Sequence, residues 1–353
     1  MSALLEVTDS GLSVTIQDRG RIGYRNIGVP LSGALDPVFL AAANALLGND
    51  PGAAALEVVL TGPSFKVVFG TVRIALAGDI GARVQSARGG ALAVKPWSTA
   101  TLFRGDVIQI GSVAGGIAYI GISGGFCVPE VLGSRSTYQR AALGGVHGRA
   151  IAAGDRLPCG EVQGDPWLEY RSPRPLQHEA LQSAPIRVIP GPQQDHFTAA
   201  AMAAFLSAPY TVTRDMDRMG LRLDGVLLEH NARGAEIVSD GVAPGSIQVP
   251  ANGHPIVLMA DCQTSGGYPK IATVISADLP RLGHARPGTT LHFEAVALPD
   301  AAAARKRQAH RLALWVEGLR SFRPAGVIDE QALYEDNLVS GVICGEEAAP
   351  LPY

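Results

Sequence analysis

Glycine and proline are unusually frequent in this chain, and their frequency most constrains what it can fold into. The 353 residues include 42 glycines and 24 prolines, against ordinary shares of about 7% and 5% for these two residue types. Both residues interrupt regular structure and supply the backbone conformations of tight turns. The sequence therefore predicts many turns that join many short strands.

The balance of charges excludes several classes of partner. Lys and Arg number 29 and Asp and Glu number 32, which gives a formal net charge of −3. A nucleic-acid or anionic-membrane surface needs a clustered basic excess, so we expect neither kind of partner. Apolar residues make up 47% of the chain, which favours a folded core over disorder. No run approaches the roughly 18 consecutive apolar residues typical of a membrane-spanning helix.

The cysteines and the N-terminal residues indicate a cytoplasmic protein. Cys127, Cys159, Cys262 and Cys344 lie far apart and form no C-x-x-C pair, so we interpret them as reduced thiols. The N-terminal segment has neither a basic region nor a long apolar stretch, which argues against a secretory signal. We therefore expect a cytoplasmic location.

Residues 1–160 are interpreted as an N-terminal β-barrel module with one helix. A helix is predicted from Pro37 to Leu47, because Asp36 can cap its N-terminus and Gly48 follows its last apolar position. Short β-branched runs have the length and composition of strands at 67–69, 72–76, 107–110 and 117–120.

A proline-rich segment with little periodicity, residues 161–185, predicts a linker. Residues 186–298 are then expected to form a C-terminal β-barrel module with a short helix at 198–207. The strands expected in this module are 186–189, 247–249, 256–259 and 291–293.

The remaining residues, 299–353, are predicted to form a helical C-terminal extension. Asp300 is expected to cap an amphipathic helix that continues to about Leu319. A weaker helical segment is expected near 329–338.

Two short motifs recur in the two modules in the same order. The segment 18–25 is matched by 217–222, since each begins with Asp-Arg and continues to a glycine. The segment 74–79 is matched by 256–261, since each is an apolar strand that ends in aspartate. The repetition suggests a duplicated barrel-like module. Helices are too few for a doubly wound α/β sheet, so we predict a mainly β fold.

Several motifs that would identify a function are absent. None of the four lysines precedes Ser or Thr in a phosphate loop, and none is flanked by Met as in a biotin-carrier loop. The eight histidines form no H-E-x-x-H motif and no ligand-like pairing with carboxylates, so we expect no metal site. No G-x-S-x-G nucleophile elbow is present. Chemistry with ATP or biotin is therefore expected to involve other chains or an unfamiliar site.

The segment from Asp261 to Lys270 has the highest density of functional groups. It follows an apolar strand, and polar groups at a strand end are typical of sites. Asp261 could act as a base and Lys270 could neutralise an oxyanion. The glycines at 266–267 could adopt positive φ and present N–H groups to an anion, and the side chains at 263–265 could bind an amide. The alternative is a polar turn whose groups bind one another.

Two further clusters offer candidate ligand groups. Asp18, Arg19 and Arg25 lie close together in the sequence, and a guanidinium group suits a carboxylate or a phosphate. Arg135 and Ser136 lie in a glycine-flanked loop with donors for an anion. In both clusters the alternative is structural, either an Asp–Arg pair that fixes a turn or hydroxyl groups that cap a loop.

Four longer stretches resemble one known family. They are the segments 28–36, 133–138, 217–220 and 261–270, which contain Gly-Val-Pro, Ser-Gly-Ala-Leu-Asp, Gly-Ser-Arg-Ser-Thr-Tyr, Asp-Arg-Met-Gly and Thr-Ser-Gly-Gly-Tyr. On these residues the chain resembles the KipA-type proteins, also called the 5-oxoprolinase C-subunit family or the biotin-dependent carboxyltransferase (allophanate hydrolase subunit 2) family. The resemblance covers nearly the whole chain up to about residue 293.

The resemblance implies a fold, partners and a nucleotide. The fold is a pair of cyclophilin-like β-barrel modules, which agrees with the recurring motifs. The partners are a KipI-like subunit and a LamB/YcsF-like subunit, which together with such proteins form a hetero-oligomeric, ATP-dependent 5-oxoprolinase. ATP binding is expected from the resemblance alone, since the sequence has no phosphate loop.

The predicted function is that of a hydrolase subunit in a 5-oxoprolinase-type complex, which opens a cyclic amide with ATP hydrolysis. In this hypothesis Asp261 handles the proton, and developing negative charge is held by Lys270, Arg19 or Arg218. The candidate substrate-binding residues are Asp18, Arg25, Arg135, Ser136, Gln263, Thr264, Ser265, Gly266, Gly267 and Tyr268.

Two alternative functions stay open from the sequence. One is the transfer of a carboxyl group from carboxybiotin, carried on another chain, to urea or a related amide. The other is a non-catalytic regulatory protein that binds a KipI-like partner.

Overall fold

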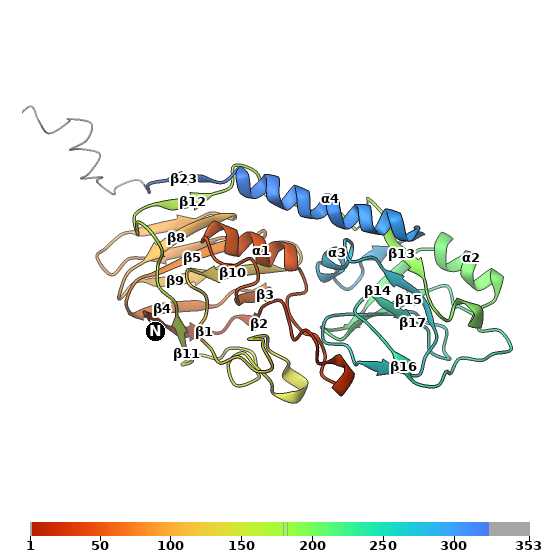
Figure 1. Cartoon of the computed structure of the whole chain (residues 1–353). Coiled ribbons are helices and arrows are strands. Elements are labelled where there is room, and N and C mark those ends of the chain that lie inside the picture. The colour runs from red at the N-terminus through yellow and green to blue at the C-terminus, as the bar shows by residue number, and fades with distance from the viewer. Residues whose placement is uncertain (1, 179, 182, 325–353) are drawn as a thin grey trace, which may run out of the picture.

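Two β-barrel-like modules lie side by side, and one long helix runs across both of them (Figure 1). The computed structural model describes residues 2–178, 180–181 and 183–324. Over these residues the secondary structure is mainly β with four α-helices, which confirms the predicted fold class. None of the described helices combines the length and the apolar character that crossing a membrane requires. The helix predicted near 329–338 lies outside the described residues.

Two sheets form the N-terminal module. The first contains, in spatial order, β11 (Arg156–Cys159), β1 (Ala3–Asp9), β4 (Ser64–Phe69), β9 (Val107–Ile110), β6 (Ala82–Gln85) and β7 (Ala91–Val94). The second contains β2 (Leu12–Gln17), β3 (Ala55–Thr61), β10 (Ala118–Ile122), β5 (Val72–Ala77), β8 (Ser98–Leu102), β12 (Glu169–Arg171) and β23 (Arg320–Phe322). The strands predicted in this module are confirmed to within a few residues.

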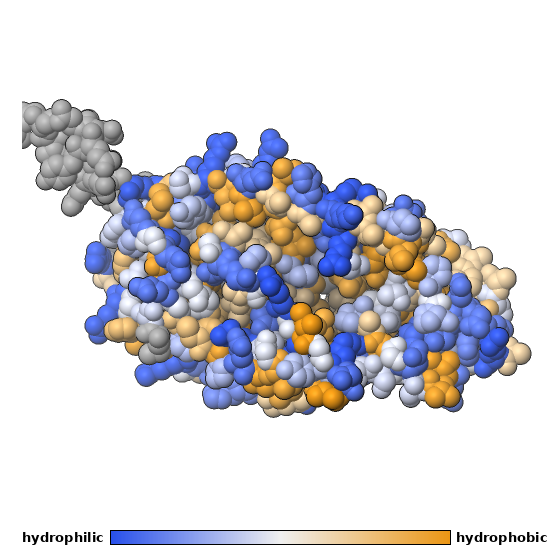
Figure 2. All heavy atoms as spheres, in the orientation of Figure 1, coloured by the Kyte–Doolittle hydropathy of each residue, from blue (hydrophilic) through white to orange (hydrophobic). Residues whose placement is uncertain are grey.

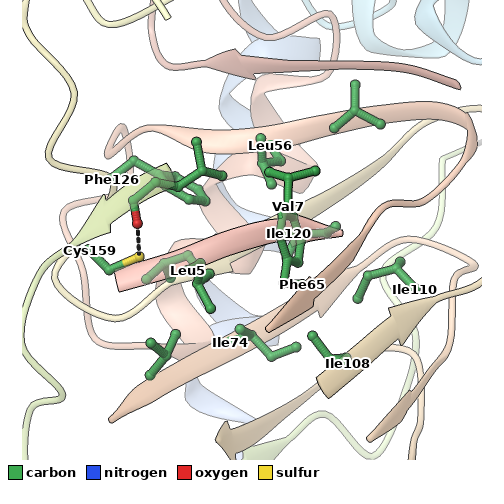
Figure 3. Packing of buried hydrophobic residues seen from close by; sticks show 14 of the residues in the cluster. Leu5, Val7, Leu56, Phe65, Ile74, Ile108, Ile110, Ile120, Phe126 and Cys159 are labelled. Carbon is green, nitrogen blue, oxygen red and sulfur yellow. Dashed lines mark hydrogen bonds between the residues drawn. The ribbon is translucent and has the colours of Figure 1, made fainter. Parts of the chain in front are cut away.

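A continuous apolar core fills the space between these two sheets. Val7 of β1, Phe65 of β4 and Ile120 of β10 are each at most 1% exposed and converge in this core (Figure 3). Along β1 the buried residues alternate with partly exposed ones, as a strand with one face in a core requires. Strand β5 is buried on both faces, because a helix covers its outer side.

That helix is α1 (Pro37–Leu46), which the sequence signals predicted. The carboxylate of Asp36 accepts hydrogen bonds from the N–H of Val38 at 2.9 Å and of Phe39 at 3.0 Å, so Asp36 is the expected N-cap. Beneath α1, β5 presents the small residues Ala75 and Ala77, which allow the helix to lie close to the sheet.

The C-terminal module is built around one eight-stranded sheet. Its strands, in spatial order, are β21 (Thr290–Leu291), β14 (Tyr210–Met216), β15 (Gly220–Gly225), β18 (Ile256–Leu258), β17 (Ser246–Gln248), β20 (Lys270–Val274), β13 (Ile186–Pro190) and β22 (Phe293–Ala295). A separate pair consists of β16 (Asp240–Gly241) and β19 (Ser265–Gly266). The helices are α2 (Ala199–Ser207), as predicted, and α3 (Leu279–Gly283).

The proline-rich segment expected to be a linker contributes structure to the N-terminal module. Its strand β12 pairs with β8 and with β23. Glu169 of β12 is 3% exposed and accepts a hydrogen bond from the N–H of Thr101 at 2.6 Å. The segment therefore extends the second sheet before it passes to the C-terminal module.

Helix α4 (Leu298–Glu317) is the strap across both modules (Figure 1). The prediction that Asp300 caps it is wrong, because the chain becomes helical at Leu298 and Asp300 lies in the first turn. Near its start, Ala301 packs with the C-terminal module. Near its end, Trp315 contacts Trp97 of the N-terminal module with ring centroids 5.6 Å apart and donates to the carbonyl of Arg174 at 2.9 Å.

The first recurring motif forms the same local turn in both modules. Asp18 follows β2 and accepts from the N–H of Gly20 at 2.8 Å, and Asp217 follows β14 and accepts from the N–H of Met219 at 2.7 Å. Both are turns in which an aspartate side chain binds the backbone two residues later. The aspartate of the common Asp-Arg pair thus forms the same turn in each module.

Truncation of Trp315 tests the attachment of the strap. We expect Trp315→Ala to lower the free energy of unfolding by about 3–5 kcal/mol, because it removes a buried indole and leaves a cavity. Leu314→Ala is the matched control, since Leu314 is 52% exposed and its loss should cost about 0.5 kcal/mol or less. Denaturant unfolding followed by circular dichroism measures both, and equal small losses would contradict the packing described.

Candidate functional site

An arginine whose side chain is only 15% exposed joins the two modules. Arg218 lies in the turn between β14 and β15 and donates from Nε to Oδ2 of Asp261 at 2.9 Å. It reaches the N-terminal module from Nη2 to the carbonyl of Gly33 at 2.6 Å and from Nη1 to Glu57 of β3. Burial by itself would lower the pKa of Arg218, but Glu57 and Asp261 raise it above its usual value. The guanidinium therefore stays charged between two carboxylates.

Tyr119 of β10 extends this network within the N-terminal module. Its hydroxyl donates to Oε2 of Glu57 at 2.6 Å and accepts from the N–H of Asp36 at 2.9 Å. The N–H of Leu35 also donates to Oε2 of Glu57, at 2.8 Å. Burial, together with the charge of Glu57, raises the pKa of Tyr119 well above its usual value, so the phenol keeps its proton and remains a donor.

Two histidines share the carboxylate of Asp36. Oδ2 of Asp36 lies 2.6 Å from Nε2 of His178 and 2.8 Å from Nε2 of His284. Burial alone would raise the pKa of Asp36, but the two imidazoles, His178 foremost, hold it well below its usual range. His178 comes from the segment between the modules and His284 from the C-terminal module, so Asp36 ties three parts of the chain together.

Asp36, His178 and His284 have the residue types of a metal site, with ligand atoms within 4.8 Å of one another. The hydrogen bonds of His284 do not fit that use. Its Nδ1 accepts from the N–H of Ile117 at 3.1 Å, so in the neutral ring the proton is on Nε2 and no lone pair remains there for a metal. A Cβ at Gly116 would lie 1.9 Å from Nδ1, so glycine is required for this approach.

Two adjoining cavities open beside Arg218. The smaller has a volume of about 400 Å³, lies between the modules and is lined in part by Tyr138 and Arg286. The larger, of about 920 Å³, extends along β14, β15 and β18. Arg140 and Asp217 line both cavities. On the face shown in Figure 2 the surface is hollowed between the two modules. We call the smaller cavity the cleft.

Four predicted site residues line these cavities. Arg218 and Asp261 line the cleft, and Gln263 and Tyr268 line the larger cavity. Both oxygens of Asp261 already accept from Arg218, at 2.9 and 3.2 Å. Arg218 is thereby engaged as a positioning residue that fixes Asp261 at the wall of the cleft.

Lys270 is directed away from Asp261. Its Nζ donates to Oδ2 of Asp240 at 2.6 Å and to the carbonyl of Gly241 at 3.1 Å. The side chain of Lys270 is 3% exposed, and it lines neither the cleft nor the larger cavity. The structure therefore does not bring Lys270 and Asp261 together on one substrate.

The expected anion nest at Gly266 and Gly267 is wrong. Neither glycine has positive φ, because residues 265–266 form strand β19 against β16. A Cβ at Gly266 would lie 2.5 Å from Nε2 of Gln248, so glycine serves packing here. The carbonyls of Thr264 and Gly267 accept backbone hydrogen bonds from residues 242 and 237, and Ser265 pairs with residue 241.

Arg19 and Arg25 lie apart from the cleft. Arg19 is exposed and pairs with Asp50 at 3.0 Å, so it does not join Arg218 or Lys270 at a common site. Arg25 reaches across the module boundary and donates to the carbonyl of Val242. Both placements agree with the structural alternative for this cluster.

Asp18 binds groups of the protein itself. Its carboxylate accepts from the hydroxyl of Ser134 at 2.6 Å, from the N–H of Arg135 at 2.6 Å and from the hydroxyl of Ser136. Arg135 pairs with Glu130 at 2.7 Å. Asp18 and Ser136 are buried, so this cluster fastens the loop at 134–136 to the end of β2.

Sequence reasoning missed several groups in this region. Arg286 lines the cleft and donates from Nη2 to the carbonyls of Val59, at 2.6 Å, and Gly116. Burial lowers its pKa, and no carboxylate pairs with it among the described residues. Glu57 was missed because it belongs to no motif, and Asp36 was predicted only as a helix cap and as part of the family segment. Arg218, which binds Glu57, and His284, which binds Asp36, lie 161 and 248 residues away from these partners in the sequence.

One protein family matches most of the chain. The family described as carboxyltransferase domain, subdomain A and B, matches residues 27–295. The 5-oxoprolinase C subunit of Escherichia coli (strain K12) is 38% identical over 310 residues, which cover 86% of this chain and 95% of the relative. That of Haemophilus influenzae is 35% identical over 312 residues, with the same coverage. The solved structure of the K. lactis urea amidolyase has a TM-score of 0.78 and 27% identity, and the match covers 89% of this chain but 20% of the amidolyase.

The Asp36 carboxylate predicts how stability depends on pH. The pKa of Asp36 is lower in the folded state than in the unfolded state. The ionised carboxylate therefore stabilises the fold above the unfolded pKa of about 4, and this stabilisation is lost as the pH falls below that value. We expect Asp36→Asn, which can still cap α1, to lower the free energy of unfolding at pH 7. Between about pH 5 and pH 3, the free energy of unfolding of this variant should fall less steeply than that of the wild type.

Denaturant titrations at a series of pH values measure this dependence. Asp50→Asn is the matched control, because the side chain of Asp50 is 69% exposed. An Asp36→Asn variant that follows the wild-type pH dependence would show that the imidazoles do not stabilise this carboxylate.

Proposed function

Because the chain belongs to the carboxyltransferase domain family, subdomains A and B, we propose that it is one component of a 5-oxoprolinase-type complex. Such a complex opens a cyclic amide and hydrolyses ATP, and its other components would be a KipI-like and a LamB/YcsF-like protein.

The observation that carries this proposal is the extent of the match with named relatives. Two proteins named as the C subunit of 5-oxoprolinase are matched over 95% of their length. A urea amidolyase of Saccharomyces cerevisiae is 32% identical, but this chain covers only 16% of it. The match therefore spans almost the whole of the two 5-oxoprolinase relatives and only a small part of the amidolyase.

The cleft offers groups that suit a small amide with a carboxylate. Its volume of about 400 Å³ accommodates one small molecule. Arg286 presents a partly desolvated cation that can pair with a substrate carboxylate. Asp261, fixed by Arg218, presents its remaining lone pairs to an amide N–H. In this proposal Arg286 binds, Asp261 orients or accepts a proton, and Arg218 positions Asp261.

The described residues around the cleft do not fit ATP. Its three lining carboxylates balance its three lining guanidinium groups, so the cleft has no excess of positive charge to hold a triphosphate; the residues are Glu57, Asp217, Asp261, Arg140, Arg218 and Arg286. The N-terminal N–H groups of α1 and α2, which could bind phosphate, already donate to their own caps, Asp36 and Thr198. We therefore assign ATP to another component of the complex, where it would supply the driving force for opening the amide.

Carboxyl transfer is the second candidate function. It is favoured by the name of the matching family and by the fold similarity to a urea amidolyase, at a TM-score of 0.78. In that case carboxybiotin, carried on another chain, would donate the carboxyl group to urea or a related amide in the same cleft.

Phosphate release by the reconstituted complex separates these functions. The chain is mixed with its KipI-like and LamB/YcsF-like partners and supplied with ATP and either 5-oxoproline or urea, with and without avidin. We expect release that requires 5-oxoproline and is insensitive to avidin. Avidin-sensitive turnover would favour carboxyl transfer. A stable complex without any turnover would favour the hypothesis of a non-catalytic regulatory protein.

Arg286→Gln tests the assignment of the cleft. We expect the KM for 5-oxoproline to rise about 10- to 100-fold, because a charge-assisted pair with the substrate carboxylate is lost. Arg222→Gln is the matched control, since Arg222 lines the larger cavity and is exposed. A KM that is equal in the two variants would place the substrate outside the cleft.

A further inference from the structure

A third cavity lies beside the strap α4 and is not used by the proposed function. Its volume is about 230 Å³, and it lies where α4 passes over α3 and β13 (Figure 1). The ionisable residues that line it are His178, Arg187, Asp278, Arg281, Arg307 and Arg311. We call it the strap cavity.

One face of α4 forms a wall of the strap cavity. Its lining residues are spaced three and four positions apart, so their side chains share one face of the helix; they are Ala304, Arg307, Gln308 and Arg311. Ala304 is 4% exposed, and Nε2 of Gln308 donates to the carbonyl of Ala277 at 2.9 Å. These two contacts hold α4 against the C-terminal module and place Arg307 and Arg311 beside the cavity.

The wall opposite α4 contains a buried ion pair. The side chain of Asp278 is 1% exposed, and its oxygens accept from Nε and Nη2 of Arg187 at 3.0 and 2.6 Å. Nη1 of Arg281 lies 3.5 Å from the same carboxylate. Asp278 is therefore engaged by two guanidinium groups of the C-terminal module, and it does not neutralise those on α4.

The two arginines of α4 have no such counter-charge. Neither Arg307 nor Arg311 forms an ion pair with a carboxylate among the described residues. Both are exposed, and residues 301–316 contain no Asp or Glu that could pair with them along the helix. Like charges four residues apart on a helix repel each other. An anion bound between the two guanidinium groups would remove this repulsion.

Size and charge decide which anion fits. A volume of about 230 Å³ lies below the roughly 300–1,000 Å³ of pockets for drug-sized ligands and cofactors, so the cavity is too small for a nucleotide. A phosphate group carries about two negative charges near pH 7, which matches the two guanidinium groups of α4. The planar fork of a guanidinium also suits phosphate oxygens, which it can bind bidentately.

From this geometry we propose that the strap cavity is a phosphate-binding site. The phosphate oxygens accept hydrogen bonds from the guanidinium groups of Arg307 and Arg311. The ligand is inorganic phosphate or the phosphate group of a small monoester, since both have the same recognition chemistry. The site is separate from the cleft and does not depend on the function proposed for it.

Calorimetric titration of the full chain at constant ionic strength tests this site with inorganic phosphate and with acetate. Acetate carries a single charge and can match only one of the two guanidinium groups. We expect saturable binding of phosphate at one site per chain and about tenfold weaker binding of acetate, or weaker still. No saturable binding of phosphate, or equal affinities for the two anions, would overturn the proposal.

Glycerol phosphate in the same titration distinguishes the two sources of the phosphate group. An affinity equal to that of inorganic phosphate would show that the site accepts a monoester. Binding that is about tenfold weaker would show that the site prefers the free ion. Both results support a phosphate site, whereas a glycerol control without phosphate that binds equally well would contradict it.

Arg307→Gln and Arg311→Gln place the effect at this cavity. Each variant removes one positive charge from the lining, so we expect about tenfold weaker binding of phosphate. Arg305→Gln is the matched control, since Arg305 lies on the same helix, is exposed and does not line the cavity. Its affinity should equal that of the wild type. Equal losses in all three variants, or no loss in either cavity variant, would show that the proposal is wrong, and thermal unfolding verifies that the variants fold.

Discussion

The guanidinium group of Arg218 binds the two barrels to each other. Arg218 belongs to the C-terminal module, yet it donates to Glu57 and Gly33 of the N-terminal module as well as to Asp261 of its own. Removing such a group from water is costly, and the cost is offset only when its donors are matched by acceptors. Here two carboxylates and a carbonyl supply the match. This requirement constrains the distance and the orientation of the two modules, together with the contacts that Arg25, Arg286 and His284 make across the same boundary.

The cavities follow from that orientation. The cleft lies beside Arg218, where Asp261 and Arg286 of one module face β2 and β3 of the other. Tyr119 links Glu57 to Asp36, and Asp36 in turn binds His178 and His284. The strap α4 closes the arrangement by packing on both modules. Function in the cleft is thus proposed for groups whose positions depend on contacts between modules.

The sequence predicted features whose causes are local. Helix α1 was predictable because its cap at Asp36 and its end before Gly48 are adjacent signals, and the mainly β fold follows from the frequency of turn residues. The partners of charged groups were not predictable in this way. Lys270 pairs with Asp240, thirty residues earlier, and Arg218 with Glu57, 161 residues away. Which charge pairs with which is decided by the packing of the modules, and the sequence does not display that packing.

Glycine illustrates the same limit within one segment. The sequence around Gly266 and Gly267 fits either an anion-binding turn or a strand. The strand is formed because residues 265–266 pair with β16 and Gln248 packs closely against Gly266. The prediction that Asp261 lies at a cavity is confirmed. It could be made because the position of an aspartate at a strand end is visible in the local sequence. Its role there depends on Arg218, whose engagement is visible only in the folded chain.

A double-mutant cycle on Arg218 and Glu57, followed by calorimetric unfolding, tests whether this ion pair joins the modules. We expect Arg218→Met to lower the free energy of unfolding by about 3–5 kcal/mol, since it leaves Glu57 and Asp261 without their cation. We expect Glu57→Gln to lower it by less, since Asp261 still pairs with the guanidinium. We also expect the double variant to lose clearly less than the sum of the two, because Glu57 is then no longer a buried carboxylate without its cation. Losses that simply add would show that the two residues stabilise the protein independently and that this ion pair does not join the modules.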